Sequence, residues 1–445
     1  MKLFGTDGIR GKANQYPITA ETALDLGKAF VTLIAKGNNS KKIKIAVGRD
    51  TRLSGAMLEE ALIAGITSAG ADAVPLGIIP TNGVSYLIGF HGCDGGVMIS
   101  ASHNPADENG FKFMSKDGFK FNEELEAQLE EIFFSKKFAS SEPGSVFRLR
   151  DVKQDYISMV GDTLQGSDLS GLKVAIDTGN GSASYLIKDL FSELKAEATI
   201  INNEPDGLNI NKDCGALFTQ KLKKVVEENK LDAGVAFDGD ADRIVMIDET
   251  GNIVEGDSLI AIAAIHLKEN GKLNKDTIVV TNYSNCGLDN SMQKLGVKTV
   301  RTKTGDKFVS AELFNNSYSI GGETSGHVIF SEFSKTADAV IASVQILNSM
   351  KEQGKKLSEL ASFVEKYPQL LVNVAVNEKK ELKDIPAVAE KIKEAESRLE
   401  NGRVFVRYSG TENKMRILVE GENEKIIKEL ADSIVETVKS EIGVK

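Results

Sequence analysis

Strand-like runs that end in polar, glycine-containing loops recur along this 445-residue chain and constrain its fold more than any other feature. Helix-period stretches adjoin these runs, an alternation that is typical of α/β units. The runs are residues 44–47, 172–176 and 277–280, and the helical stretches are 22–34, 182–194 and 258–267. Their spacing is too irregular for a solenoid. The pattern therefore predicts three divergent α/β units of about 100–130 residues each.

Each unit is predicted to contain a second strand followed by a loop of polar or ionisable side chains. The strands and their loops are 96–99 with 100–105, 234–237 with 238–243, and 318–320 with 321–327. Ligands of open α/β sheets bind beside the carboxyl ends of the strands, so we expect the three loops to converge on one cleft. The alternative is three unrelated turns, which the chemical content of the loops disfavours.

Changes in composition predict the domain boundaries. Residues 138–145 are typical of a linker, a turn follows at 249–252, and Tyr367-Pro368 marks a third change. The tail predicts a small α+β domain, with a charged helix at 378–398, strands at 404–406 and 416–419, and a final helix from Glu424. The predicted domains are 1–150, 151–253, 254–368 and 369–445, three related α/β domains with mixed sheets and a smaller C-terminal domain.

Charge and hydropathy exclude several classes of partner. The formal net charge is −10 without a Lys/Arg-rich block, which argues against a nucleic acid or an anionic membrane. The apolar stretch 259–267 is far shorter than the ~20 residues of a membrane span. Cys93, Cys214 and Cys286 lack the spacing of a disulfide framework or a zinc site. Together with an N-terminus that has no signal-peptide core, they predict a cytoplasmic protein with reduced thiols.

Three alternating carboxylates predict a magnesium site. Asp238, Asp240 and Asp242 can point to one side of an extended loop, and hard oxygen donors of this kind suit Mg²⁺. An EF-hand is the rival, since Glu249 stands at the twelfth position. However, Arg243 occupies the position that needs Gly, and strands rather than helices are predicted on both sides. A purely structural turn is the remaining alternative.

Ser102 is the candidate for covalent chemistry. It lies in a loop with His103 and Asn104, but the chain has no Gly-x-Ser-x-Gly elbow there, and adjacent Ser and His side chains point apart in a strand. A phosphoryl-carrying serine is the alternative, because its phosphate would complete the coordination offered by the aspartates. An ordinary loop serine is the default without the other motifs.

Two further loops have ligand-binding chemistry. Residues 407–411 combine a forked cation, two hydroxyl groups and a glycine, a composition that suits a phosphate site, although a simple β-turn is an equal alternative. Its phosphate-binding candidates are Arg407, Ser409, Gly410 and Thr411. Glu323 and Ser325 lie on one side of an extended segment and suit sugar hydroxyl groups. His327 can add a donor there, or it can be structural.

In this order, the four loops resemble those of the α-D-phosphohexomutase family. The resemblance extends over nearly the whole chain. Three other segments match the branch that acts on glucosamine phosphates: 4–11 (Phe-Gly-Thr-Asp-Gly-Ile-Arg-Gly), 205–211 and 304–307. Thr324 stands where that branch usually has Gln, and Tyr408 and Asn413 stand where Pro is common. These departures concern sugar preference and leave the reaction class unchanged.

The resemblance implies four domains around a cleft, with one Mg²⁺ held by Asp238, Asp240, Asp242 and phosphorylated Ser102. It implies that Arg10 and Arg243 neutralise the transferring group and that Lys303 contacts the sugar together with Glu323, Ser325 and His327. Lys112 matches a family lysine for proton transfer, and the sequence does not choose between it and His103. The implied partner is a hexose or hexosamine phosphate, and a homodimer is possible.

The implied reaction interconverts glucosamine 6-phosphate and glucosamine 1-phosphate through a hexosamine 1,6-bisphosphate, which acts as intermediate and activator. Such a reaction would feed the synthesis of UDP-N-acetylglucosamine and cell-wall precursors. Mannose or glucose phosphates are the alternative substrates. A metal-dependent sugar phosphatase would instead release free phosphate. A sugar-phosphate sensor is disfavoured, because binding alone needs no cluster of three acids.

Overall fold

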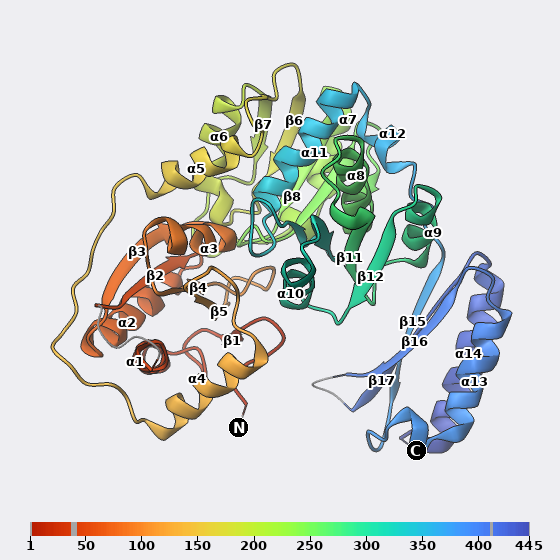
Figure 1. The fold of residues 1–445 in the computed structure, drawn as a ribbon, viewed down its shortest axis with the longest axis horizontal. Helices are drawn as coiled ribbons and strands as arrows, with labels where there is room; N and C mark the ends of the chain where they lie inside the picture. The colour runs from red at the N-terminus through yellow and green to blue at the C-terminus, as the bar shows by residue number, and fades with distance from the viewer. Residues whose placement is uncertain (1, 37–41, 410–412, 445) are drawn as a thin grey trace. The chain divides into compact units, whose positions relative to one another are not determined.

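The computed structural model describes residues 2–36, 42–409 and 413–444. Within these residues the chain forms four β-sheets with helices packed against them, which confirms the predicted α/β class (Figure 1). The chain divides into two compact units, Met1–Thr281 with Thr302–Ala361, and Asn282–Arg301 with Ser362–Lys445. Each unit has its own packed interior. In the described part of the chain, no helix is both long enough and apolar enough to cross a bilayer.

The first sheet of unit 1 is mixed, with the strand order β1-β5-β4-β2-β3. Strand β2 pairs in parallel with β3 and β4, and β5 turns back antiparallel to β4 and β1. The strands are β1 (Ile9–Lys12), β2 (Lys44–Arg49), β3 (Asp72–Ile78), β4 (Gly95–Ile99) and β5 (Glu108–Ser115). The helices are α1 (Ala20–Ala35), α2 (Gly55–Ser68), α3 (Thr81–Phe90) and α4 (Glu123–Ser135). Apolar side chains of α1, α2, α4 and the sheet form its core.

The second sheet repeats this plan with the order β10-β9-β8-β6-β7. Strand β6 pairs in parallel with β7 and β8, and β9 returns antiparallel to β8. The strands are β6 (Lys173–Asp177), β7 (Glu197–Ile201), β8 (Ala233–Phe237), β9 (Ile244–Asp248) and β10 (Ile253–Val254). The helices are α5 (Val152–Asp162), α6 (Ile187–Glu193) and α7 (Gln220–Asn229). The helix predicted at 182–194 is interrupted, because a short 3₁₀ turn over Ser182–Tyr185 precedes α6.

The third sheet contributes β11 (Thr277–Thr281), β13 (Ile320–Gly322) and β14 (Val328–Phe330) to unit 1. Strand β11 is parallel to β13, and β13 forms an antiparallel hairpin with β14. The strand predicted at 318–320 begins only at Ile320, the last residue of that prediction. The helices of this region are α8 (Gly256–Glu269), α10 (Asp306–Asn316), α11 (Ala339–Gln353) and α12 (Leu357–Ala361).

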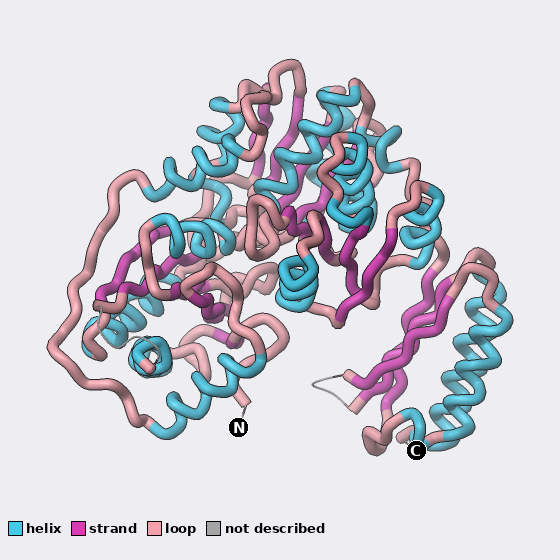
Figure 2. The backbone as a smooth tube through the Cα atoms, viewed as in Figure 1, coloured by secondary structure: helices cyan, strands magenta, loops and turns pink. Residues whose placement is uncertain are grey.

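Unit 2 contains the predicted small α+β fold. Its antiparallel sheet has the order β15-β17-β16, and the amphipathic helices α13 and α14 cover one face (Figure 2). The elements are β15 (Gln369–Ala375), α13 (Pro386–Arg398), β16 (Arg403–Tyr408), β17 (Lys414–Glu420) and α14 (Glu424–Ile442). Helix α9 (Cys286–Lys294) and most of β12 (Lys298–Thr302) also belong to this unit.

The helix predicted at 378–398 was placed too early, because α13 begins at Pro386. Proline has no backbone N–H and restricts the residue before it, so it favours the first turn of a helix over the interior.

Candidate active site

Ser102 lies in the loop after β4, with its side chain buried against the loop after β8. Its Oγ donates a hydrogen bond to Asp238 Oδ2 at 2.7 Å. The residue has a φ of 54°, in the left-handed region that is costly for a residue with a Cβ. A Cβ on Gly239 would lie 2.6 Å from the Ser102 carbonyl oxygen, so the close approach of the two loops requires glycine there. The structure thus brings together the predicted serine and the predicted acidic loop.

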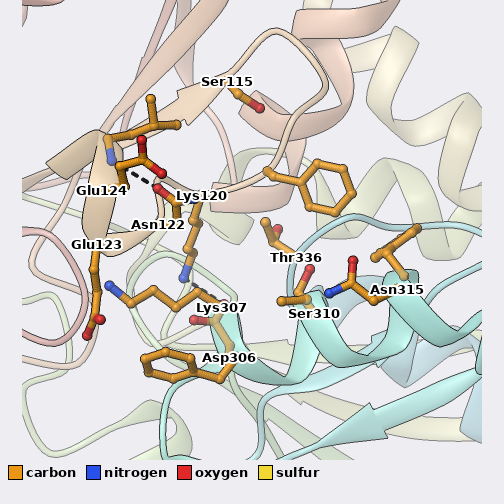
Figure 3. Close-up of a pocket in the computed structure, with 15 residues that line it drawn as sticks. Ser115, Lys120, Asn122, Glu123, Glu124, Asp306, Lys307, Ser310, Asn315 and Thr336 are labelled. Carbon is orange, nitrogen blue, oxygen red and sulfur yellow. Dashed lines mark hydrogen bonds and ion pairs between the residues drawn. The ribbon is translucent and has the colours of Figure 1, made fainter. Parts of the chain in front are cut away.

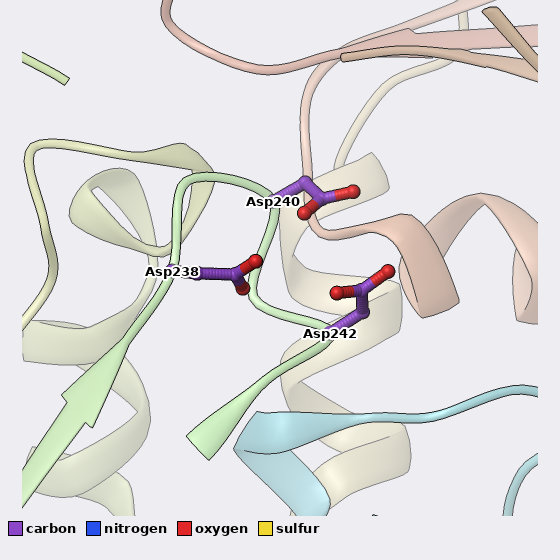
Figure 4. Close-up of side chains that lie close together, drawn as sticks. All are labelled: Asp238, Asp240 and Asp242. Atoms are coloured by element: carbon purple, nitrogen blue, oxygen red, sulfur yellow. The ribbon is translucent and has the colours of Figure 1, made fainter. Parts of the chain in front are cut away.

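The three aspartates form a compact buried cluster on the loop between β8 and β9 (Figure 4). One carboxylate oxygen of each lies within 4.8 Å of the other two. Asp240 Oδ1 is buried without a hydrogen-bond partner among the described residues, which leaves a ligand atom available. Strands rather than helices flank the loop, and Glu249 instead accepts a hydrogen bond from Ser358. These residues can hold a divalent metal ion, and an EF-hand is excluded.

The surroundings shift the pKa values of Asp238 and Asp242 in opposite directions. Burial, together with the charges of Asp242 and Asp240, raises the pKa of Asp238 to about 7. Burial also acts to raise the pKa of Asp242, but Lys112, His327 and Lys120 outweigh it and hold this pKa well below its usual range. The unequal titration of neighbouring carboxyl groups is typical of functional sites.

Lys112, on β5, is a buried cation within the acidic cluster. Its Nζ lies 2.6 Å from Asp240 Oδ2, 2.7 Å from Asp242 Oδ2 and 3.1 Å from Asp7 Oδ2. Burial acts to lower the pKa of Lys112, but the three carboxylates outweigh it and raise the pKa above its ordinary value. The side chain is therefore a protonated amine at neutral pH.

Arg10, on β1, lies at the same end of the first sheet and pairs with Asp7. Its Nη2 lies 2.5 Å from Asp7 Oδ2, and its Nε donates to the Asp7 carbonyl oxygen at 3.2 Å. Burial acts to lower the pKa of Arg10, but Asp7, followed by Asp240 and Asp242, raises it. Arg10 thus adds a permanent positive charge close to the acidic cluster.

Arg243 connects two histidines at the end of the acidic loop. Its Nη1 lies 2.7 Å from His103 Nδ1, and its Nε lies 3.2 Å from His327 Nε2. Burial, Arg243 and Arg10 lower the pKa of His103 to about 4, so its imidazole is neutral at pH 7. His103 Nδ1 is also 3.4 Å from Ser102 Oγ.

The hairpin between β13 and β14 carries the predicted sugar-binding residues. Glu323 Oε1 accepts a hydrogen bond from the Gly305 N–H at 2.8 Å, and its Oε2 lies 2.6 Å from His327 Nδ1. Burial acts to lower the pKa of His327, but Asp242, 3.1 Å from its Nε2, raises it to about 10. His327 therefore joins the hairpin to the acidic loop through its two ring nitrogens. Ser325, between β13 and β14, is exposed, and so is Lys303, which lies before α10 rather than on the hairpin.

The predicted phosphate loop follows β16 in unit 2. Arg407 Nε donates to Tyr283 Oη at 2.9 Å, and its guanidinium carbon lies 5.1 Å from the centre of that ring. Ser409 is buried, and its carbonyl oxygen accepts a hydrogen bond from Lys379 Nζ at 2.7 Å. Gly410 and Thr411 lie outside the described residues.

Reasoning from the sequence missed several charged residues in the two units. Arg416 lies directly opposite Arg407 in the β16–β17 pair, and the buried Nε of Arg416 has no hydrogen-bond partner among the described residues. Pairing the two predicted strands as a hairpin would have identified it. Asp7, Lys120 and Asp306 form a second buried ion-pair network, with Lys120 Nζ 3.0 Å from Asp7 Oδ1 and 2.7 Å from Asp306 Oδ2. Only the fold brings these three together.

A cavity of about 570 Å³ lies beside this network, between the segment around Lys120 and helix α10 (Figure 3). Its lining includes Lys120, Asp306, Lys307 and Phe314, and the predicted site residues are not among its described lining. Lys120 Nζ also lies 3.5 Å from Asp242 Oδ2. The cavity therefore adjoins the acidic cluster without being formed by it.

Comparison with known proteins identifies the family to which this chain belongs. Models of the phosphoglucomutase/phosphomannomutase family match the chain over their α/β/α domains I, II and III and their C-terminal domain, at residues 1–140, 154–251, 255–367 and 371–437 respectively. The chain belongs to this family, and the predicted resemblance to phosphohexomutases is confirmed.

Two relatives that match over nearly their full length come from one branch of this family. The chain is 43% identical to a phosphoglucosamine mutase of Geobacter sp. (strain M21) over 449 residues, which is 99% of this chain and 98% of that protein. It is 44% identical to a phosphoglucosamine mutase of Caldicellulosiruptor bescii, over 99% of this chain and all of that protein.

Solved structures share the fold. A phosphoglucomutase/phosphomannomutase family protein from Burkholderia thailandensis superposes with a TM-score of 0.84 at 22% identity, over 99% of both chains. The N-acetylphosphoglucosamine mutase of Aspergillus fumigatus, in complex with GlcNAc-6P and magnesium, has a TM-score of 0.69 at 19% identity, over 99% of this chain and 96% of that one.

Proposed function

We propose that this protein is a phosphoglucosamine mutase that interconverts glucosamine 6-phosphate and glucosamine 1-phosphate. The observation that carries the proposal is the 2.7 Å contact of Ser102 Oγ with Asp238 inside a buried cluster of three carboxylates. A serine hydroxyl placed beside a metal-binding cluster is suited to carry a phosphoryl group. Full-length relatives named phosphoglucosamine mutase support the amino-sugar substrate.

The reaction is two phosphoryl transfers in opposite directions. Phosphorylated Ser102 gives its phosphoryl group to O1 of glucosamine 6-phosphate, so the bond from phosphorus to Oγ breaks and a bond to O1 forms. The O1 proton leaves, and Ser102 Oγ regains a proton. The 1,6-bisphosphate then returns its 6-phosphoryl group to Ser102, and glucosamine 1-phosphate remains.

Mg²⁺ is the metal proposed for the cluster. Asp238, Asp240 and Asp242 would hold it together with phosphorylated Ser102, because hard carboxylate and phosphate oxygens are its preferred ligands. When bound, it supplies positive charge to the oxygens of the transferring phosphoryl group. Arg10 and Arg243 add permanent positive charge at the same place.

His103 and Lys112 are suited to opposite proton-transfer roles. Since its pKa is lowered to about 4, His103 is neutral at pH 7 and can accept a proton. Lys112 is held protonated and can donate one. The sugar is expected to bind Glu323, Ser325, His327 and Lys303. Arg407, Ser409, Gly410 and Thr411 are expected to bind its non-reacting phosphate, and Arg416 would add a second guanidinium there.

A cytoplasmic location and a possible homodimer are also part of the proposal. Cys93, Cys214 and Cys286 are all buried thiols, which suits a reducing compartment. Sedimentation equilibrium of the purified protein tests the dimer.

A panel of hexose 6-phosphates tests the proposed function. Each would be supplied with its 1,6-bisphosphate and Mg²⁺, and the substrates would be ranked by kcat/KM, with free phosphate measured in the same samples. We expect glucosamine 6-phosphate to rank first and its 1-phosphate to be the product. A higher kcat/KM for mannose or glucose phosphates would reassign the substrate, and stoichiometric free phosphate would identify a phosphatase.

A further inference from the structure

Arg52 is a fully buried arginine that binds the Ser102 loop through its whole guanidinium group. Its side chain is 1% exposed. Nε pairs with Asp50 Oδ2 at 2.9 Å. The two terminal nitrogens donate to four backbone carbonyl oxygens, those of Ser102, Asn104, Pro105 and Glu108. All five N–H groups of the guanidinium are thereby used, which leaves none for a ligand.

The sheet explains why Arg52 reaches this loop. Strands β2 and β4 are adjacent and parallel, with Arg49 in register with Ile99, so the loops that follow them start side by side. The loop after β4 turns away from the ladder, and its carbonyl groups need donors because buried carbonyls are costly when unpaired. Arg52 supplies these donors from the neighbouring loop.

A second set of contacts fixes Ser102 itself. Asp50 Oδ2 accepts a hydrogen bond from Ser100 Oγ at 2.6 Å, and Ser100 Oγ accepts one from the Ser102 N–H at 2.8 Å. The Ser102 backbone is therefore held at both its N–H and its carbonyl group. Such bracing can hold a residue at a φ of 54°, where it is not locally favoured.

The acidic loop is also held by a loop that follows the neighbouring parallel strand. Strand β6 lies beside β8, and the Ser182 N–H from the loop after β6 donates to the Gly239 carbonyl oxygen at 2.8 Å. The two supporting loops also meet, since Thr51 Oγ1 donates to the Asn180 carbonyl oxygen at 2.6 Å. The loop after β2 thus supports the Ser102 loop after β4, and the loop after β6 supports the acidic loop after β8.

We propose that Arg52 is a positioning residue for phosphoryl transfer, which holds Ser102 Oγ at the distance from the three aspartates that the reaction needs. Because the charge of Arg52 is paired with Asp50, its effect is on geometry rather than on the charge of the transferring group. The inference depends on the proposed mutase function. Misplacement of a reacting group by about 1 Å can cost about 100-fold in rate.

The test is Arg52→Lys, because lysine keeps the charge but has three donors instead of five. We expect kcat to fall about 100-fold, with KM for glucosamine 6-phosphate unchanged. Amide hydrogen exchange in the peptide spanning residues 100–108 should become faster. The matched control is Arg49→Lys, whose guanidinium pairs with Glu59 at 2.8 Å and donates to the Asp50 carbonyl oxygen at 3.3 Å, away from the Ser102 loop. The control should keep the wild-type kcat.

An unchanged kcat in folded Arg52→Lys, or an equal loss of kcat in the Arg49→Lys control, would overturn the inference. If Arg52→Lys does not fold, Ser100→Ala removes only the link from Asp50 to the Ser102 N–H and should lower kcat about tenfold, as expected for one lost hydrogen bond. Its control is Ser85→Ala, which removes a buried hydroxyl that donates to the Gly118 carbonyl oxygen at 2.6 Å. Equal kcat for Ser100→Ala and Ser85→Ala would also refute the inference. A wild-type protein inactive on every hexose phosphate would instead refute the proposed function.

Discussion

Two arginines that face each other across a strand pair are costly unless an anion lies between them. Arg407 and Arg416 are directly opposite in the antiparallel β16–β17 pair, so their side chains project from the same face. Arg407 is oriented by Tyr283, whereas the buried Nε of Arg416 has no hydrogen-bond partner in the described part of the chain. A phosphate group would both neutralise this repulsion and use the unpaired donor.

Arg407→Ala should therefore weaken substrate binding. Loss of a charge-assisted contact of about 1.5–3 kcal/mol predicts a KM increase of roughly 10–150-fold. We expect a smaller loss of kcat, because remote binding also holds the sugar in register. Steady-state kinetics measures both, with Arg398→Ala as the control, since Arg398 is exposed on α13 and pairs with Glu429.

The phosphoserine content of Arg407→Ala, measured by mass spectrometry on the same sample, should equal that of the wild type. Loss of phosphate from Ser102 with KM unchanged would instead place Arg407 at the reacting end of the substrate.

Ser102→Ala should abolish mutase turnover, because it removes the atom that carries the phosphoryl group. Ser100 cannot replace it, since its Oγ is engaged by Asp50 and by the Ser102 N–H. We expect kcat to fall by about 10⁴-fold or more, as for other covalent nucleophiles. The control Ser85→Ala, which changes a buried serine on α3, should keep the wild-type activity. Near-normal turnover by Ser102→Ala would refute the phosphoserine mechanism.

The loop between β8 and β9 concentrates negative charge that the fold alone does not fully compensate. Lys112 pairs with Asp240 and Asp242, whereas Asp238 forms no ion pair with a side chain of the described residues and is buried beside both. Burial and these neighbours raise the pKa of Asp238 from 3.8 to about 7. The folded, metal-free state thus binds a proton that the unfolded state releases between those two values. The contribution of Asp238 to the free energy of unfolding of the metal-free protein therefore decreases as the pH rises through this window.

Mg²⁺ should stabilise the protein more at about pH 8 than at about pH 5.5, because it competes with the proton on Asp238. At about 100 times Kd, a bound ligand stabilises by about 2.7 kcal/mol, or about 5–10 °C in Tm. Thermal melting with and without Mg²⁺ at both pH values measures this difference.

Asp238→Asn should raise the metal-free Tm at about pH 8 and remove the gain from Mg²⁺. Asp213→Asn, an exposed acid in the same sheet region, is the control and should keep the gain. An equal Mg²⁺ effect in the wild type and Asp238→Asn would exclude this residue as a ligand.

The whole chain consists of two compact units with separate interiors, so its unfolding should not be two-state. Leu62 is buried in the core of the first sheet and Leu430 in the core of unit 2. A buried Leu→Ala substitution costs about 2–5 kcal/mol, which is about 10 °C or more in Tm for a unit of about 100 residues such as unit 2, and less for the larger unit 1.

Differential scanning calorimetry should therefore resolve at least two transitions. Leu430→Ala should lower only one of them, and Leu62→Ala should lower another. If each substitution shifted every transition by the same amount, the two units would unfold cooperatively as one.

The sequence by itself determined the features that depend on neighbouring residues. Strand and helix periodicity located β2, β4, β6, β8, α1, α8 and α14, because burial of one face imposes a pattern within a few residues. The alternating aspartates and Ser102 were visible for the same reason, since each loop carries its chemistry in consecutive positions. The start of α13 at Pro386 was a local signal that was overlooked.

Only the tertiary structure decided which distant residues meet. Arg52 is one basic residue among many in the sequence, and its role depends on β2 and β4 being adjacent in the sheet. The network of Asp7, Lys120 and Asp306 joins side chains from separate parts of the chain. Helix α9 belongs to the same compact unit as β15–β17, although it precedes them by a long stretch of chain. One of the contacts between them is the hydrogen bond from the Cys286 N–H to Glu420. Such long-range contacts leave no periodic trace in the sequence, since they depend on packing between elements rather than on the burial of one face.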